Sequence, residues 1–378
     1  MSERQELVDE ATRLQLLKRS SDWLSESKEQ FEEAVEWRTA LLADWDEADL
    51  DGAATNAVKA YESREELVKT FFPSQYWRTL GFESEVESID DVRERYQWAR
   101  TYGHSTLQRQ GRFEAISLTD IGVDMQAEES RYPLREKKAD LRAMIAKMRE
   151  LLFEERSVDL VVDSLHGIHR AHHVVELAID RELEPSIAQM HMRTEFPCRI
   201  VGGFRASMDA RVKKAFRVVL KQWSRHAKGR NPFDLTDHLG FRFICPDVAE
   251  AEGACEALKR FAGRIDATVD KVENNLAGGN PADASNPHSS PDHRMIKMLL
   301  RWQKRRYEIQ IMTFEGSLSS LYASDTVNHL MYEFMSGVAE GGPIERLLPA
   351  SIYGVDTRDR GVRRKMYRHV CRHVEWDD

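Results

Sequence analysis

The sequence has 378 residues, a formal net charge of −9, 41% hydrophobic residues and 31% charged residues. This length is enough for two domains with sizeable cores, and the composition is typical of a water-soluble globular protein. No run of about 18 apolar residues occurs, so no membrane-spanning helix is expected. The N-terminal sequence MSERQELVDEATRLQ lacks the apolar core of a secretory signal, which favours a cytoplasmic protein.

The cysteines favour the same compartment. The chain has four of them, scattered and without a CxxC pair: Cys198, Cys245, Cys255 and Cys371. Disulfide frameworks are typical of oxidising compartments and of closely patterned cysteines. We therefore expect these four residues to be reduced and mostly buried.

Positive charge is concentrated in two segments of this acidic chain. Residues 193–230 contain eleven Lys and Arg but only two acids, and residues 294–306 contain six Lys and Arg and no acid. Such segments favour an anionic partner such as polyphosphate or nucleic acid, although a solvated basic face gives the same pattern.

Residues 1–190 are expected to be almost wholly helical. Apolar residues recur at helical spacing along this region, and charged residues fill the other faces. We expect helix breaks at 49–52 and 72–74, and long helices at 134–155 and 158–181. No motif in this region points to a chemistry, so we treat it as a candidate surface for a protein partner.

From residue 191 the pattern changes to short strands and helices. The apolar stretch that begins at Cys198 and ends in paired glycines indicates a strand or turn, and residues 207–226 indicate a basic helix. A strand at 240–245 ends at Pro246-Asp247, and the aspartate is placed to cap a helix at 248–262.

The rest of this region indicates one more strand and a hairpin. A strand at 265–272 precedes a Gly/Pro/Asn/Ser-rich loop at 277–293, and strands at 295–302 and 307–313 are joined by a basic turn. This order predicts a mixed sheet flanked by helices, and an α+β fold for the whole chain. We expect three parts: a helical region at 1–190, a sheet domain at 191–335 and a basic C-terminal tail at 336–378.

Two acids in the sheet domain stand out. Alternation along 307–313 places Glu308 and Gln310 on the face opposite the apolar one, where an acid is costly unless that face lines a solvated or metal-binding site. Asp237 lies just before the strand 240–245, so the two acids converge if the strands are neighbours. Two carboxylates surrounded by Arg and Lys suit Mg²⁺ and a triphosphate. The alternatives are a solvent-facing strand acid for Glu308 and a turn residue for Asp237.

These residues resemble the motifs of the RelA/SpoT-type (p)ppGpp synthetases. DHLGFR at 237–242 resembles the D-x-x-G-x-R motif of that family, and EIQIMT at 308–313 resembles its E-[VI]-Q-[IL]-R-T strand. HLMY at 329–332 resembles the H-x-x-Y that follows in a helix. The order and rough spacing agree across residues 195–335.

The resemblance implies a nucleotidyltransferase-like fold that transfers pyrophosphate from ATP to a ribose 3′-hydroxyl, as the alarmone synthetases of the stringent response do. Asp237 would ligate Mg²⁺, and Glu308 would be the second metal-site acid or the base that takes the hydroxyl proton. The residues that would contact ATP are Arg205, Ser207, Arg211, Lys213, Lys214 and Arg242. Those that would contact the acceptor are His293, Lys297, Gln310 and His329.

Three positions depart from the family pattern. His293 stands where the family has the Tyr that stacks on guanine, Lys297 stands where it has a His, and Met312 stands where it has an Arg. These departures favour a different nucleotide or an RNA 3′ end as the acceptor, as in the toxin branch that resembles these synthetases but modifies tRNA, and they leave binding of a guanine nucleotide open. The alternatives are a degenerate domain that binds a nucleotide without turnover, and a helical partner-binding protein in which the two acids lie far apart.

A group of histidines and a basic C-terminal segment are more simply explained by structure than by catalysis. The histidines His166, His169, His172 and His173 lack the Glu and the third ligand of a zinc protease, so we expect a surface or inter-helix cluster, with a structural metal as the alternative. Residues 358–372 are basic and indicate a solvated helix, with RNA or the acidic N-terminal half of the chain as alternative contacts.

Overall fold

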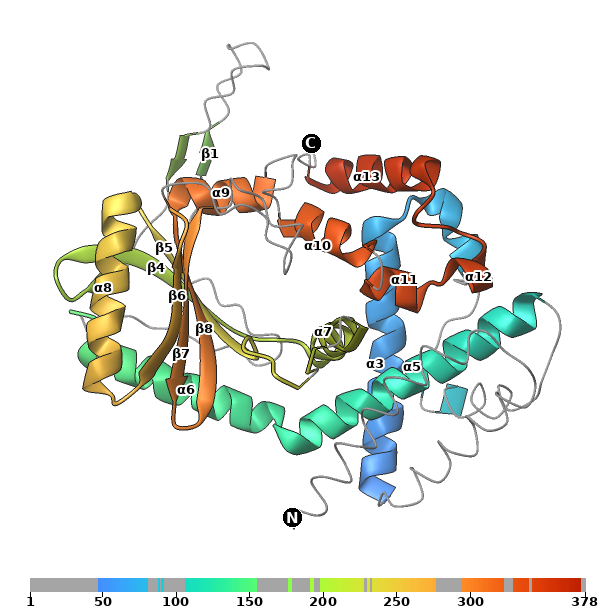
Figure 1. Ribbon diagram of the computed structural model, residues 1–378, viewed down its shortest axis with the longest axis horizontal. Helices are drawn as coiled ribbons and strands as arrows, with labels where there is room; N and C mark the ends of the chain where they lie inside the picture. The colour runs from blue at the N-terminus through green and yellow to red at the C-terminus, as the bar shows by residue number, and fades with distance from the viewer. Residues whose placement is uncertain are drawn as a thin grey trace. The chain divides into compact units, whose positions relative to one another are not determined.

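The computed structural model describes residues 47–80, 88, 90–91, 106–154, 176–178, 191–193, 198–227, 230–231, 233–276, 294–322, 329–339 and 342–374. Helices come first in the chain and a mixed six-stranded sheet follows, so the expected α+β fold is confirmed (Figure 1). The chain divides into two compact units. One is helical and comprises Met1–Pro133, Ala215–Asp234 and Ser324–Asp378; the other, which holds the sheet, comprises Leu134–Lys214 and Leu235–Ala323.

These units do not follow the boundaries expected at residues 190 and 335. The chain leaves the helical unit after Pro133, returns to it for Ala215–Asp234 and returns again at Ser324. Each unit is therefore assembled from segments that are distant in the sequence. Local sequence patterns do not predict which of these segments pack together.

The described residues of the helical unit form two long helices and several shorter ones. Its α-helices are α3 (Glu47–Phe71), α5 (Thr106–Arg131), α7 (Ala215–Ala227), α10 (His329–Gly337), α11 (Pro343–Leu347), α12 (Ala350–Tyr353) and α13 (Arg360–Val374). Two 3₁₀ turns, η2 (Ser74–Tyr76) and η3 (Arg78–Leu80), follow α3. The break expected at 72–74 is confirmed, since Pro73 precedes η2 and ends the long helix.

Small residues let α3 and α5 approach closely. A Cβ on Gly122 of α5 would lie 2.6 Å from the backbone nitrogen of Ala57 in α3, and a Cβ on Gly52 would lie 2.4 Å from Oε1 of Gln126. The helix break expected at 49–52 is therefore wrong: Gly52 lies inside α3, where it makes room for the neighbouring helix instead of ending its own.

The C-terminal helix α13 is part of the core of the helical unit. Met366 and Val370 are fully buried in the same cluster as Phe71 of α3 and Phe334 of α10. The exposed face of α13 carries the basic residues, which agrees with the solvated helix expected there. A ring nitrogen of His369 also lies 3.0 Å from the carbonyl oxygen of Lys69, so α13 contacts the N-terminal half of the chain.

The second unit is a mixed sheet with strand order β3-β4-β5-β8-β7-β6. The strands are β3 (Cys198–Ile200), β4 (Phe204–Val212), β5 (Leu239–Cys245), β6 (Thr268–Asn274), β7 (Met295–Trp302) and β8 (Arg305–Thr313). β5 and β8 are parallel, and every other neighbouring pair is antiparallel. Its helices are α6 (Leu134–Leu151), α8 (Val248–Arg264) and α9 (Phe314–Tyr322), and a separate small sheet pairs β1 (Glu176–Ala178) with β2 (His191–Arg193).

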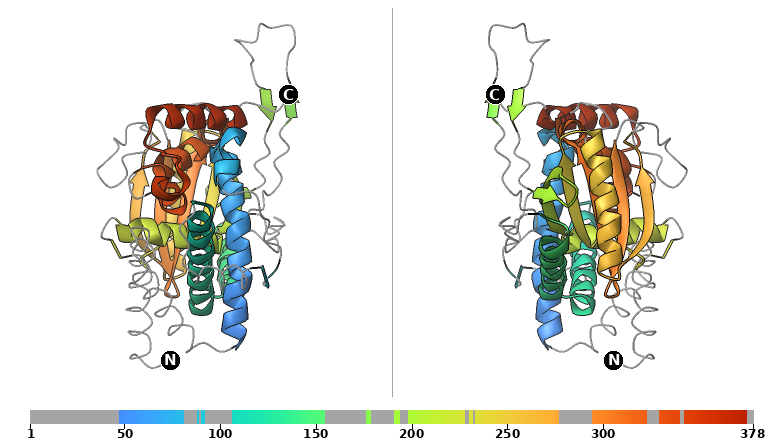
Figure 2. Two further views of the ribbon diagram at one scale, coloured as in Figure 1. Left: turned by 90° about the vertical axis from the view of Figure 1, so that its right-hand side faces the viewer. Right: turned by 90° about the vertical axis from the view of Figure 1, so that its left-hand side faces the viewer.

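Alternation gives this sheet one apolar and one polar face. On the apolar face, Phe241 of β5 and Ile309 of β8 are register partners, and both are buried. Helix α8 contacts strands β4 to β8 and buries Leu258 and Phe261, and it lies along the sheet in Figure 2. Helix α6 packs on this face as well, since the hydroxyl of Tyr307 donates to the carbonyl oxygen of Asp140 at 3.3 Å.

Two of the expected helices are wrong in part. The basic helix expected at 207–226 begins only at Ala215, because residues 204–212 form strand β4, which pairs with β5 from Ser207 to Val212. The helix expected at 158–181 is contradicted at residues 176–178, which pair with β2 as a strand. The rest of that span lies outside the described residues.

The cysteine expectation is confirmed. All four cysteines are free, and only Cys371 is not fully buried. Burial raises the pKa of Cys198 and of Cys245 to about 12. The thiolate is the nucleophile in disulfide exchange, so these two residues are protected both sterically and chemically.

We expect Ellman's reagent to label one thiol rapidly in the folded protein at pH 8, and that thiol to be Cys371. The other three should react only when urea unfolds the chain, because their side chains are buried. Cys371→Ser should remove the fast phase and leave the slow one unchanged. Rapid labelling of two or more thiols in the folded protein would contradict this packing.

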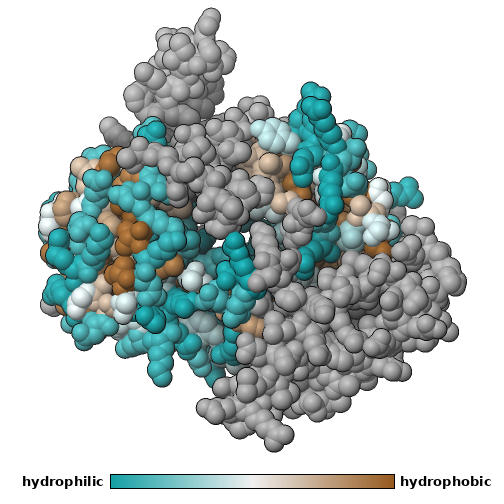
Figure 3. Space-filling view, in the orientation of Figure 1, coloured by the Kyte–Doolittle hydropathy of each residue, from teal (hydrophilic) through white to brown (hydrophobic). Residues whose placement is uncertain are grey.

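Hydrophilic residues cover most of the described surface on the side shown in Figure 3, and a hydrophobic area shows between them over the sheet. Edge strand β6 contributes exposed apolar surface, since Val272 is 36% exposed. None of the described helices is both long enough and apolar enough to span a bilayer.

Candidate functional site

The polar face of the sheet brings charged residues from four neighbouring strands into register. Arg211 of β4 is opposite Gly240 of β5, and Gly240 is opposite Glu308 of β8. One step along, Gln310 of β8 lies between Arg242 of β5 and Lys297 of β7. Paired residues point to the same face of a sheet, so this register alone places the cations around Glu308.

Glu308 is the centre of this arrangement. Only 5% of its surface is exposed, and both of its carboxylate oxygens have protein partners. Oε2 lies 2.8 Å from Nζ of Lys297, while Oε1 accepts a hydrogen bond of 2.8 Å from Nε2 of Gln310 and lies 3.9 Å from Nη2 of Arg211. A buried carboxylate is costly unless it is paired and hydrogen-bonded, and these contacts supply that compensation.

Gly240 allows Arg211 to reach across strand β5. A Cβ at this position would lie 3.3 Å from Nε and 3.4 Å from Cγ of Arg211. Any side chain there would push the guanidinium away from Glu308, since 3.3 Å is already a tight contact. The glycine of the DHLGFR segment is thus explained by close approach on the polar face.

Gln310 connects Arg242 to Glu308. Its Oε1 accepts hydrogen bonds from Nε and Nη2 of Arg242 at 3.3 and 3.2 Å, and its Nε2 donates to Glu308. The side-chain amide is therefore oriented by a cation on one side and an anion on the other. Such a chain of hydrogen bonds fixes the positions of its members.

Asp237 lies just before β5 and is also 5% exposed. Its Oδ2 accepts a hydrogen bond from Nζ of Lys213, and the backbone N–H of Lys213 donates to the carbonyl oxygen of His238 at 2.9 Å. These two contacts tie the end of β4 to the segment that carries Asp237. Strands β5 and β8 are parallel neighbours, and Asp237 lies just before the first while Glu308 lies within the second.

Both acids act on Lys297. Burial lowers the pKa of Lys297, but the charge and hydrogen bond of Glu308 raise it more, with further contributions from Asp237 and Glu273. The net effect is a pKa above the ordinary value for a lysine. Lys297 therefore carries its positive charge throughout the neutral pH range, and it is within electrostatic reach of both carboxylates.

The other residues expected at the site come from several elements. Arg205 pairs with Glu250 of α8, with Nε 3.1 Å from Oε1, and the structure shows no contact of Arg205 with either acid. Ser207 is buried within β4 on the same face as Asp209 and Arg211, and Lys214 is exposed just after that strand. His329 begins α10 in the helical unit. His293 lies outside the described residues.

Two acids on the polar face were missed in the sequence. Asp209 of β4 is opposite Arg242, and Glu273 of β6 is opposite Lys297. Strand alternation gives the signal for Asp209, which lies two residues before Arg211, but it is usable only once residues 204–212 are recognised as a strand.

Among the described residues, no group of three or more His, Cys, Asp and Glu side chains is placed to hold a metal ion. The histidine cluster at 166–173 lies outside those residues, so the explanation given for it stays a prediction. A metal ion bound by Asp237 and Glu308 would need further oxygen ligands from a bound molecule or from water.

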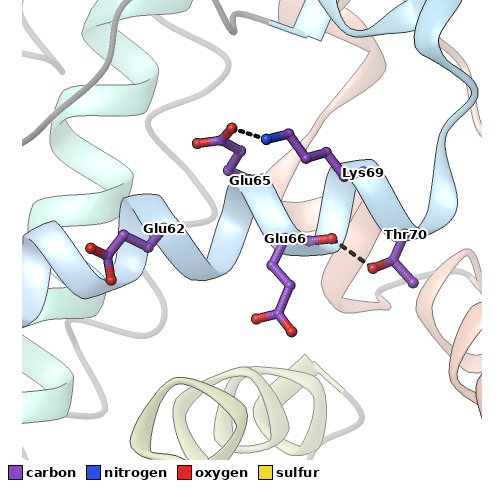
Figure 4. Close-up of a pocket in the computed structure, with 5 residues that line it drawn as sticks. All are labelled: Glu62, Glu65, Glu66, Lys69 and Thr70. Carbon is purple, nitrogen blue, oxygen red and sulfur yellow. Dashed lines mark hydrogen bonds and ion pairs between the residues drawn. The ribbon is translucent and has the colours of Figure 1, made fainter.

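A hollow of about 580 Å³ lies on the helical unit and is lined by Glu62, Glu65, Glu66, Lys69 and Thr70 of α3. Figure 4 shows Glu65 and Lys69 turned towards each other, and their charged atoms are 2.5 Å apart. Thr70 donates to the carbonyl oxygen of Glu66 one turn earlier. These are ordinary contacts along a solvated helix, so the hollow has none of the convergent chemistry of the sheet face.

No protein-family model matches the chain, and no curated protein matches it. Among solved structures, the small alarmone synthetase 1 from Bacillus subtilis bound to its product pppGpp matches with 16% identity and a TM-score of 0.28, over 52% of this chain and 78% of that chain. The protein smu.1046c from Streptococcus mutans UA159 matches with 19% identity and a TM-score of 0.26, over 45% of this chain and 81% of that chain. Both TM-scores are low, so neither likeness bears on the site or the activity.

Proposed function

We propose that the polar face of the sheet binds ATP and transfers its pyrophosphoryl group to the 3′-hydroxyl of a nucleotide. The observation that carries this proposal is the buried Glu308, held among Arg211, Lys297 and Gln310 on neighbouring strands. The order of the motifs at 237–242 and 308–313 supports the same reaction class.

Four cations would hold the phosphates of ATP. Arg211, Lys213, Arg242 and Lys297 all point from the sheet or its edge towards the region of the two acids. Arginine forms paired hydrogen bonds with phosphate oxygens, and lysine supplies a compact charge. In phosphoryl-type transfer most of the catalysis comes from positioning and from neutralising charge on the transferred group.

The number of acids here, Asp237 and Glu308, matches the way in which phosphate-transferring sites bind magnesium. Mg²⁺ is usually bound by one or two carboxylates, with substrate phosphates and water completing its octahedron. The two acids supply that number of carboxylates, and the cations beside them would bring the phosphates. When bound, the ion would neutralise charge on the phosphates.

The chemistry of the transfer assigns roles to Glu308 and to the cations beside it. The acceptor 3′-oxygen forms a bond to the β-phosphorus of ATP, the bond from that phosphorus to the oxygen bridging it to the α-phosphorus breaks, and AMP leaves with that oxygen. Glu308 takes the proton of the 3′-hydroxyl, while Arg211 and Lys213 hold the phosphates in line. Besides holding phosphate, Arg242 orients Gln310 against Glu308.

The acceptor can be identified from AMP release. We expect ATP labelled in its adenine ring to yield AMP when GTP, GDP, ATP or tRNA is supplied, and one of these to give a rate at least ten times that of the others. Release with tRNA alone would identify an RNA 3′ end as the acceptor. No AMP above the protein-free background with any of the four would contradict the proposed transfer.

The second candidate function is a nucleotide sensor without turnover. The observation that favours it is the ion pair of Glu308 with Lys297, because a carboxylate held by an ammonium 2.8 Å away is a weaker proton acceptor. This function predicts that ATP raises the melting temperature of the protein while no AMP forms. A melting temperature unchanged by all four nucleotide and RNA ligands would contradict the sensor.

A further inference from the structure

Lys297 occupies the position that a metal ion would need. Its Nζ is 2.8 Å from Oε2 of Glu308, and it lies within reach of the charge of Asp237. The other oxygen of Glu308 is engaged by Gln310 and Arg211. A divalent cation that bound Glu308 at Oε2 would therefore share that oxygen with an ammonium group.

The two cations exclude one another on simple electrostatic grounds. Like charges a few ångströms apart repel strongly in a mostly buried site, where solvent screens them little. Lysine has no lone pair to offer a metal while it is protonated, so it cannot become a ligand. One of the two cations has to leave Oε2 before the other binds there.

We propose that Lys297 is a resident cation that keeps divalent metal ions off Asp237 and Glu308 in the nucleotide-free protein. This inference rests on the proposed function in taking these two acids as the metal ligands. It adds that the two acids bind a metal ion only after the ammonium of Lys297 has moved away from Glu308.

The negatively charged phosphates of ATP attract the ammonium of Lys297 away from Glu308. The side chain of Lys297 is 34% exposed and has a flexible four-carbon stem, so its ammonium can turn from Glu308 to a phosphate oxygen. That movement frees Oε2 for a metal ion. Metal and nucleotide then bind with positive coupling, and the coupling is reciprocal, because each ligand stabilises the state that the other requires.

The test measures Mn²⁺ binding to the nucleotide-free protein by electron paramagnetic resonance. We expect Lys297→Gln to bind one Mn²⁺ at least ten times more tightly than the wild type, and Lys297→Gln with Glu308→Gln to lose that site. Lys304→Gln is the matched control, since it removes the same charge from the exposed turn of the same hairpin. It should behave as the wild type does.

Equal Mn²⁺ affinities of the wild type and Lys297→Gln would overturn the inference. Lys297→Met provides a second neutral variant if the glutamine variant does not fold, and the partial exposure of the side chain favours tolerance of both. No nucleotide is present in this experiment, so its result is independent of AMP release. A failure of the proposed transfer is read from the labelled-ATP assay and is thereby distinguishable from a failure of this inference.

Discussion

Replacing Glu308 by Gln is expected to lower the rate of AMP release about 1,000-fold. The substitution keeps the shape of the side chain and an acceptor for Gln310, but it removes the proposed base and one of the two proposed metal ligands. General-base catalysis alone contributes about 100- to 10,000-fold. The loss should appear mainly in kcat, because Arg211 and Lys213 still hold the phosphates of ATP.

The control for this variant is Glu256→Gln. Glu256 is an exposed acid on α8, which covers the opposite, apolar face of the sheet. We expect it to leave the rate unchanged, and both variants to keep the melting curve of the wild type within a few degrees. A Glu308→Gln protein that is folded and retains more than about a tenth of the rate would exclude Glu308 as the base.

The second large effect concerns stability of the helical unit. Arg64 and Glu114 form an ion pair of 2.7 Å with side chains only 4% and 7% exposed. Arg64 also donates to the carbonyl oxygen of Leu80 at 2.8 Å and to the hydroxyl of Tyr353 at 3.0 Å. Removing one member of such a pair leaves the other charge buried, which costs about 3–5 kcal/mol.

We therefore expect Arg64→Met to lower the free energy of unfolding of the helical unit by about 3–5 kcal/mol, measured by urea denaturation. The double variant Arg64→Met with Glu114→Leu should recover part of that loss, because no charge then remains unpaired. Glu65 and Lys69 of α3 form the surface control in the same unit: their ion pair is about half exposed, so Lys69→Met should cost under about 1 kcal/mol. A similar small cost for Arg64→Met would show that the buried pair contributes little.

Much of the sheet unit could be predicted from the sequence, because local signals there agree with the tertiary structure. The hairpin at 295–313 combines period-two alternation with a basic turn, and the structure has strands at both expected places. Asp247 was expected to cap the next helix, and its side chain accepts the N–H of Glu250 in α8. In these segments the local sequence pattern was enough to predict the structure.

The errors arose where tertiary contacts override the local signal. Strand β4 contains alternate small and apolar residues among charges, and Ala206, Met208 and Arg211 are all compatible with a helix. Pairing with β5 decides the outcome, and that partner lies more than twenty residues away. Gly52 was taken as a helix end for the same reason, since only its contact with Gln126 of α5 explains it.

The candidate site could be predicted only in part. Glu308 and Gln310 followed from alternation within one strand, but the contact of Lys297 with Glu308 depends on the register between β7 and β8. The family resemblance implied an acceptor contact for Lys297, whereas the structure pairs its ammonium group with the carboxylate of Glu308. The roles of Asp237 and Glu308 as catalytic residues stay predictions until a ligand is seen.

The most direct measurement is a crystal structure of the protein with a non-hydrolysable ATP analogue. We predict that its phosphates contact Arg211, Lys213 and Arg242 at hydrogen-bond distance, about 3 Å, and that the ammonium of Lys297 has left Glu308. An analogue bound elsewhere on the chain, with the ion pair between Lys297 and Glu308 intact, would contradict the account of the polar face as a nucleotide site.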